Sequence, residues 1–168
     1  MESLLDWMKH GSPCYDPNRI GAVSMAKVLS ALTAAGKIVL TPSLWVRPYD
    51  FVIDDEGSFY RVQCKTGRMF RGAVYFRPHR LRAARRDTGW QRRTTSYRGE
   101  VDYFGVYCPE NESVYLVPID DVSCTRVCSL RMTPPKNNQA KRIRWAEQYL
   151  VVPKPIPLGT SLDDLIFD

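Results

Sequence analysis

Two β-prone segments joined by a turn constrain most strongly what this chain can fold into. The segments Tyr49 to Asp54 and Ser58 to Lys65 are rich in aromatic and β-branched residues, and Asp54-Asp55-Glu56-Gly57 joins them. Segments of this kind, separated by a short Asp- and Gly-containing turn, predict an antiparallel β-hairpin. We therefore expect the fold to be organised around this hairpin.

Three polar residues of the predicted hairpin, Asp50, Gln63 and Lys65, are expected to lie close together on its two strands. Residues i and i+2 of a strand share a face, so Gln63 and Lys65 point one way while Val62 and Cys64 point the other. Asp50, on the first strand, lies across from the polar pair. A carboxylate and an amide oxygen beside a lysine would suit a divalent cation and a phosphodiester.

Asp50 is the strongest candidate, because an acid in an otherwise apolar strand is costly unless it binds something. The alternative for Asp50 is a structural salt bridge to Arg47 or Lys65. In the functional interpretation, Lys65 stabilises the charge on phosphoryl oxygens or orients the attacking water. One carboxylate and one amide bind Mg²⁺ weakly, so substrate phosphates and water would complete the coordination shell.

Several motifs, taken in order, resemble the PD-(D/E)XK nuclease superfamily, with Gln63 in the (D/E) position. The likeness is greatest to the group I intron-associated endonucleases and the archaeal-type Holliday junction resolvases, and it covers roughly residues 18–150. The matching pieces are Ile20-Gly21-Ala22 with Ala26-Lys27-Val28, Gly36 to Pro42, Arg61 to Gly67, and Tyr97-Arg98-Gly99-Glu100 leading to Asp102.

This resemblance implies an α/β fold with a restriction-endonuclease-like core, in which helices near 18–35 and 138–150 flank a central mixed β-sheet. It implies that Asp50, Gln63 and Lys65 are catalytic, and that Asp50, Gln63 and the backbone carbonyl of Cys64 bind Mg²⁺, for which Mn²⁺ can substitute. The implied activity is that of a Mg²⁺-dependent endodeoxyribonuclease similar to the intron-associated homing endonucleases. The alternatives are a Holliday junction resolving nuclease and a catalytically silent DNA-binding protein of the same fold.

One departure from the family pattern favours the silent alternative. The family carries a glutamate on its first helix, and Met25 occupies the matching position. A thioether does not ligate Mg²⁺, which prefers hard oxygen donors. The chain would therefore bind metal more weakly, use fewer metal ions, or be catalytically silent.

The charge of the chain is concentrated in one segment. The net charge is +6, but the segment 68–98 has ten arginines and one acid, Asp87, which gives 10 − 1 = +9. Arginine binds phosphate bidentately, so this concentration favours DNA over a merely solvated basic loop. The predicted DNA-binding residues are Arg68, Arg71, Arg77, Arg80, Arg82, Arg85, Arg86, Arg92, Arg93 and Arg98.

Length and composition favour one nuclease-like domain over residues 1–152, followed by a Pro-rich linker and an acidic, apolar tail over 153–168. The five cysteines have no disulfide or zinc spacing, and the chain has neither a membrane-spanning apolar run nor a signal peptide. We expect a protein of the cytoplasm or the nucleoid. Cutting two DNA strands needs two sites, so a homodimer or a dimer of dimers is expected.

Outside the hairpin, the patterns predict a first strand at 37–40, extending to 46, and further strands at 73–76, 103–108 and 113–118. The insert 77–99 is expected to contain a helical turn around Leu81 to Arg86. A last helix is predicted over 137–150, with Ile143, Ala146 and Leu150 on its apolar face.

Overall fold

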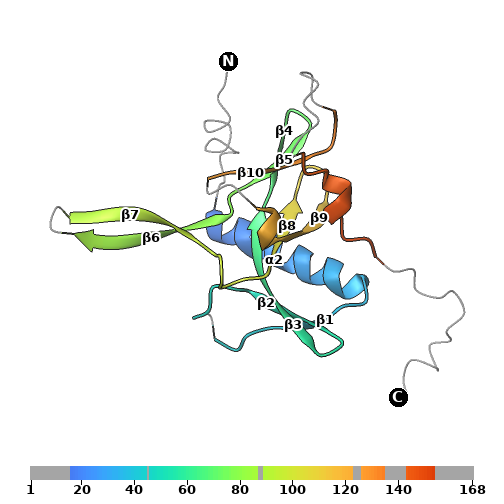
Figure 1. The fold of residues 1–168 in the computed structure, drawn as a ribbon, viewed down its shortest axis with the longest axis horizontal. Helices are drawn as coiled ribbons and strands as arrows, with labels where there is room; N and C mark the ends of the chain where they lie inside the picture. Colours follow the sequence, from blue (N-terminus) through green and yellow to red (C-terminus); the bar gives the residue numbers. More distant parts are fainter. Residues whose placement is uncertain (1–15, 45, 87–88, 123–125, 135–142, 154–168) are drawn as a thin grey trace, which may run out of the picture.

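The computed structural model describes residues 16–44, 46–86, 89–122, 126–134 and 143–153, with the backbone alone for 81–86 and 89–93. Its one long helix is α2 (Pro17–Ala34). The strands are β1 (Ile38–Leu40), β2 (Phe51–Asp55), β3 (Ser58–Thr66), β4 (Arg68–Phe70), β5 (Ala73–Phe76), β6 (His79–Arg86), β7 (Gly89–Ser96), β8 (Tyr103–Cys108), β9 (Ser113–Pro118) and β10 (Cys128–Arg131) (Figure 1).

The helix predicted near residues 18–35 is confirmed as α2. The carboxylate of Asp16 accepts a hydrogen bond from the Asn18 backbone N–H at 2.9 Å, which caps the helix, and Pro17 occupies the first turn, where its missing N–H costs nothing. Gly36, with a φ of 76°, follows the last turn.

A mixed five-stranded sheet with the order β1-β2-β3-β8-β9 forms the centre of the fold. Strands β3 and β8 run parallel, and the other neighbouring strands pair antiparallel. The predicted hairpin is β2–β3, and its turn residues Glu56 and Gly57 have φ values of 52° and 89°. Two residues with positive φ form the tight turn that matches the twist of the strands.

Helix α2 covers one face of this sheet. Val28 and Leu32 are buried there with Phe51, Ile53 and Val62. The opposite face carries a second core, in which Phe104 and Val106 of β8 pack with residues of a small sheet ordered β10-β5-β4. The predicted α/β fold with a central mixed sheet is therefore confirmed.

Strands β6 and β7 form a third, two-stranded sheet and pair only with each other. This hairpin projects sideways from the rest of the chain (Figure 1). The prediction of a helical turn around Leu81 to Arg86 is therefore wrong. Cross-strand hydrogen bonds to β7 take up the backbone groups that a helix would have used within the segment.

Two other predictions need correction. The first strand ends at Leu40 and does not continue to Val46, because a bend occupies residues 43–44. In the predicted last helix, residues 137–142 lie outside the described part, and 143–150 contain only a short 3-10 helix, η2 (Ala146–Tyr149). Trp145 and Leu150 on either side of it form isolated β-bridges.

The bounds predicted for β5, β8 and β9 are confirmed. Residues 154–168, which contain the predicted tail, lie outside the described residues. Among the described helices, none is both long and apolar enough to cross a bilayer.

Candidate active site

Asp50 lies immediately before β2, at the edge that this strand shares with β3. Its backbone N–H donates to the carbonyl of Val62 at 2.8 Å, which continues the ladder between the two strands. Its carboxylate oxygen Oδ2 accepts hydrogen bonds from the Cys64 backbone N–H at 2.7 Å and from the side-chain amide of Gln63. Asp50 is thus hydrogen-bonded directly to Gln63 and Cys64 of β3, the strand that the sequence predicts to lie across from it.

Burial dominates the electrostatics of this carboxylate. Loss of solvent raises the pKa of Asp50 above its ordinary value, while the Cys64 N–H and the Lys65 charge act in the opposite direction. A buried carboxylate with a raised pKa gains from a nearby cation, which stabilises its charged form.

The amide of Gln63 bridges two oxygens. Its Nε2 donates to the Asp50 carboxylate and, at 3.3 Å, to the backbone carbonyl of Cys64. These oxygens are two of the three metal ligands that the family resemblance implies, and the partly positive NH₂ group lies between them. Turning the amide over would place Oε1 there as a third oxygen.

The residues therefore fit a weakly held Mg²⁺ better than a tightly held ion. Mg²⁺ prefers oxygen ligands and keeps several waters when the protein supplies few. Within the described residues, no group of three or more His, Cys, Asp and Glu side chains could hold a metal. Helix α2 contains no acidic residue, so Asp50 is the carboxylate that this donor set offers.

Lys65, on β3, extends toward the base of the β6–β7 hairpin. Its Nζ lies 3.0 Å from the Tyr97 hydroxyl and 3.4 Å from the carbonyl oxygen of His79, and it lies over the Tyr97 ring at 4.4 Å from the centroid. Burial lowers the pKa of Lys65 to about 8, although the Asp50 charge acts to raise it.

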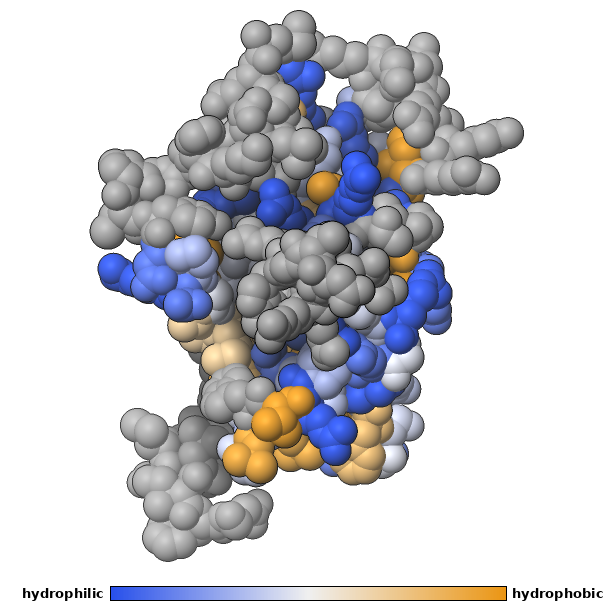
Figure 2. Space-filling view, turned by 90° about the vertical axis from the view of Figure 1, so that its left-hand side faces the viewer, coloured by the Kyte–Doolittle hydropathy of each residue, from blue (hydrophilic) through white to orange (hydrophobic). Residues whose placement is uncertain are grey.

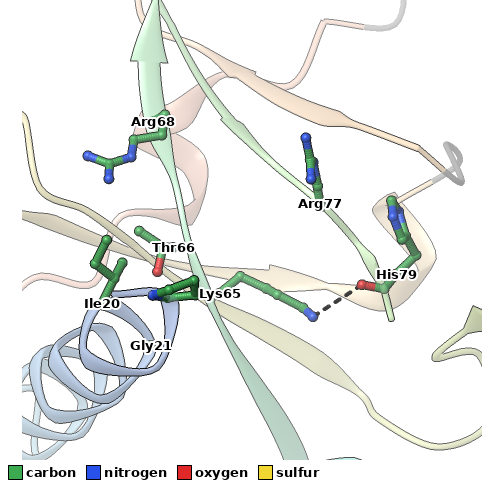
Figure 3. A pocket seen from close by; sticks show the side chains of 8 residues that line it. Ile20, Gly21, Lys65, Thr66, Arg68, Arg77 and His79 are labelled. Atoms are coloured by element: carbon green, nitrogen blue, oxygen red, sulfur yellow. Dashed lines mark hydrogen bonds between the residues drawn. The ribbon is translucent and has the colours of Figure 1, made fainter. Parts of the chain in front are cut away.

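Lys65 also lines an open pocket of about 220 Å³ at the end of β3. Arg68 and Arg77 lie around the same space, and Ile20 and Gly21 of α2 form its other side (Figure 3). A lysine and two arginines around one open pocket make a site that favours an anion such as a phosphate.

The register of the central sheet separates the residues of β3 by face. Gln63 and Lys65 pair with Phe104 and Val106, which belong to the core on the side opposite α2. Cys64 packs against the core under α2, and burial strongly raises the pKa of its thiol. Gln63 and Lys65 therefore share a face, and the Cys64 side chain turns to the other.

Met25 is half-buried and packs against the core under α2. The pocket beside Lys65 is lined from α2 by Ile20 and Gly21, one turn earlier. Next to Met25, the buried Ser24 hydroxyl forms a 2.6 Å hydrogen bond with that of Thr66, which ties α2 to the end of β3.

The ten arginines of 68–98 fall into groups. Three are ion-paired: Arg68 with Glu110 at 3.5 Å, Arg80 with Glu100 at 2.6 Å, and Arg98 with Asp120 at 3.7 Å. Two others are exposed: Arg71, which lies over the Phe70 ring, and Arg77. The remaining five belong to the β6–β7 hairpin, where the structure describes the backbone: Arg82, Arg85, Arg86, Arg92 and Arg93.

Two further side chains fix the surroundings of the site: Tyr97, for which the sequence allows either base stacking or anchoring of the insert to the core, and Arg61. Tyr97 is 5% exposed and packs edge-on against Phe104, so it anchors the hairpin to the core and does not offer its ring to a base. Arg61 donates two side-chain hydrogen bonds to Asp102, both 2.9 Å long, and lowers the pKa of that carboxyl. Motif spacing does not show the pairing of Arg61 with Asp102, because these residues are 41 positions apart.

The central mixed sheet thus carries a carboxylate, an amide and a lysine on adjoining strands. The family model for the PD-(D/E)XK endonucleases matches residues 15–152, and the chain belongs to this family.

Among solved structures, the chain is similar to the bacterial homing endonuclease I-Ssp6803I, with 22% sequence identity and a TM-score of 0.62. The match covers 81% of this chain and 89% of the homing endonuclease, and at this identity it shows a shared fold. The comparison with curated proteins gives no match.

Proposed function

We propose that the protein is a metal-dependent endodeoxyribonuclease that hydrolyses phosphodiester bonds in duplex DNA. The observation that carries the proposal is the convergence of the Asp50 carboxylate, the Gln63 amide and the Cys64 carbonyl on one point beside Lys65. Mg²⁺ is the proposed cofactor and Mn²⁺ its substitute, because the three groups supply oxygen ligands.

In this proposal Asp50, the Cys64 carbonyl and the turned amide of Gln63 hold the ion. When bound, the ion supplies a more acidic water and polarises the phosphoryl group. Lys65, held by the Tyr97 hydroxyl, would donate a further N–H to a phosphoryl oxygen, where negative charge grows as water attacks phosphorus. The bond between phosphorus and one sugar oxygen breaks, and the products are an alcohol and a phosphomonoester.

DNA as the substrate is supported by the basic segment and by the anion-binding character of the pocket. Arg68 and Arg77 would hold the phosphate next to the one attacked at Lys65. The exposed Arg71 and the arginines of the β6–β7 hairpin extend the basic surface away from the pocket. A homodimer or a dimer of dimers would supply one site for each DNA strand. The proposed location is the cytoplasm or the nucleoid, where the DNA substrate is found.

The second candidate is a DNA-binding protein of the same fold without catalysis. The observation that favours it is the absence of any acidic residue from α2, where Met25 packs into the core. A junction-resolving nuclease remains a variant of the main proposal, because it would use the same donor set on a different DNA.

The test is a cleavage assay on a linear duplex and on a four-way junction, each with Mg²⁺, with Mn²⁺ and with chelator. We expect metal-dependent cutting of the duplex and none with chelator. Cutting of the junction alone would assign the protein to the resolving nucleases. Tight DNA binding with no cutting in either metal would overturn the proposal in favour of the silent binder.

A further inference from the structure

The β6–β7 hairpin is built as a projecting ribbon. Each strand has eight residues, paired in register from His79 with Ser96 to Arg86 with Gly89. At about 3.3 Å per residue, the ribbon is about 26 Å long. It forms no strand pairing with the other sheets and stands away from them in Figure 1.

The composition of the ribbon does not suit a core element. Residues 79–96 contain six arginines and one acid, a net charge of 6 − 1 = +5, and few large apolar residues. Strand register places Arg82 opposite Arg93, a pairing of like charges that destabilises a hairpin. An isolated two-stranded hairpin is marginally stable even without such a pair. A polyanion bound along the ribbon would relieve this repulsion.

The root of the ribbon is held beside the candidate active site. Arg80, whose side chain is 15% exposed, pairs with Glu100 and lies over the Tyr97 ring at 5.2 Å from the centroid. Lys65 donates to the carbonyl of His79, the first residue of β6. The face toward which the ribbon projects is hydrophilic over much of its coloured surface, with an apolar patch near the lower edge (Figure 2). A duplex with a phosphate at Lys65 would thus lie within reach of the ribbon.

We propose that the β6–β7 hairpin enters the major groove of duplex DNA next to the phosphodiester held at Lys65. The inference rests on the proposed function, which makes DNA the substrate. The major groove of B-DNA is about 12 Å wide and admits a two-stranded ribbon, whereas the minor groove is about 6 Å wide. The major groove of an RNA duplex is too deep and narrow, so the ribbon would also select DNA over RNA.

The experiment measures binding of the full chain in Ca²⁺, so that affinity is read without cleavage. The probes are a plain DNA duplex, the same duplex with glucosylated hydroxymethylcytosine filling the major groove, the plain duplex saturated with the minor-groove ligand netropsin, and an RNA duplex of the same sequence. We expect glucosylation and the RNA duplex each to weaken binding about tenfold or more, and netropsin to change it little.

Two double variants, each of which removes two positive charges, distinguish entry of the ribbon into the groove from a general effect of net charge. Arg82→Gln with Arg93→Gln removes the opposed pair from the ribbon, and Lys27→Gln with Arg126→Gln removes two exposed charges elsewhere. The ribbon variant should lose most of its sensitivity to glucosylation and keep or raise its melting temperature, because a repulsion is gone. The control should keep the sensitivity. Binding that ignores glucosylation and is displaced by netropsin would overturn the inference.

These outcomes are distinct from those that test the proposed function. A protein that binds through the major groove but never cuts would refute the nuclease and leave the ribbon in place. A protein that cuts in Mg²⁺ but binds glucosylated and plain DNA equally would refute the ribbon alone.

Discussion

The ammonium group of Lys65 lies 3.0 Å from the hydroxyl of Tyr97 and 4.4 Å from the centroid of its ring. Tyr97 is the first residue after β7 and is buried against Phe104. The residue that fixes the β6–β7 hairpin to the core therefore also holds the amino group of the candidate catalytic lysine.

Tyr97→Phe removes this hydroxyl and keeps the ring that packs on Phe104. Lys65 then loses one hydrogen-bond partner, so its amino group is held less firmly near the scissile phosphate. Cleavage should slow about tenfold. The free energy of unfolding should fall by about 1 kcal/mol, and the affinity for DNA should stay the same. Single-turnover rates and binding curves check this. Tyr75→Phe, a hydroxyl loss in β5, is the matched control, and an equal slowing in both variants would contradict the role of Tyr97.

Cleavage should fall as pH rises through about 8. Burial lowers the pKa of Lys65 to about 8, so its ammonium is charged below this pH and neutral above it. Only the charged form stabilises the negative phosphoryl oxygens, so the alkaline limb of the rate profile belongs to Lys65. Lys65→Arg, which stays charged, should cut slowly and without this limb. A wild-type rate that stays level toward pH 10.5, the ordinary pKa of lysine, would argue against the assignment.

Gly105→Ala should destabilise the fold where α2 meets the central sheet. An added Cβ would lie 2.7 Å from Cγ1 of Val28 and 3.2 Å from that of Val62, both buried. We expect a loss of about 1–3 kcal/mol in the free energy of unfolding, measured with denaturant. Gly21→Ala is the counterpart. Nothing lies within 4 Å of a Cβ added at Gly21, so alanine should raise the free energy of unfolding by up to about 1 kcal/mol. The same sign for both changes would contradict this packing.

Met25→Glu should lower stability. The side chain is half-buried against the core that contains Val28 and Val62, and a carboxylate there loses solvent without a partner. The expected cost is about 1–3 kcal/mol at neutral pH, and Met25→Leu should be nearly neutral. Denaturant unfolding of both variants measures the difference. Unchanged stability together with tighter Mg²⁺ binding would instead show that position 25 opens onto the metal site.

Elements defined by nearby residues could be predicted from the sequence. The β2–β3 hairpin follows from its turn and from the alternation along β3, and these also place Gln63 and Lys65 on one face. The position of α2 could be predicted because helical spacing and capping are local features of the sequence. The family resemblance then supplied the central mixed sheet, without the order of its strands.

Elements that depend on distant partners could not be predicted. The segment Leu81 to Arg86 is rich in good helix formers, and only its pairing with β7 makes it a strand. Strand β10 exists because Cys128 and its neighbours pair with β5, far earlier in the chain. The hydrogen bond between Lys65 and Tyr97 is another such case, because the two residues are 32 positions apart. The roles assigned to Asp50, Gln63 and Lys65 stay predictions until activity is measured.

The most direct test of the account compares wild type with Asp50→Ala for cleavage and for DNA binding under the same conditions in Mg²⁺. Asp50 supplies the one carboxylate of the donor set, so its removal should abolish cleavage. DNA affinity should be preserved, because the arginines that bind phosphate are untouched. Matched melting temperatures would show that both proteins are folded. Asp50→Ala that cuts DNA at the wild-type rate would contradict the site and the metal-dependent mechanism built on it.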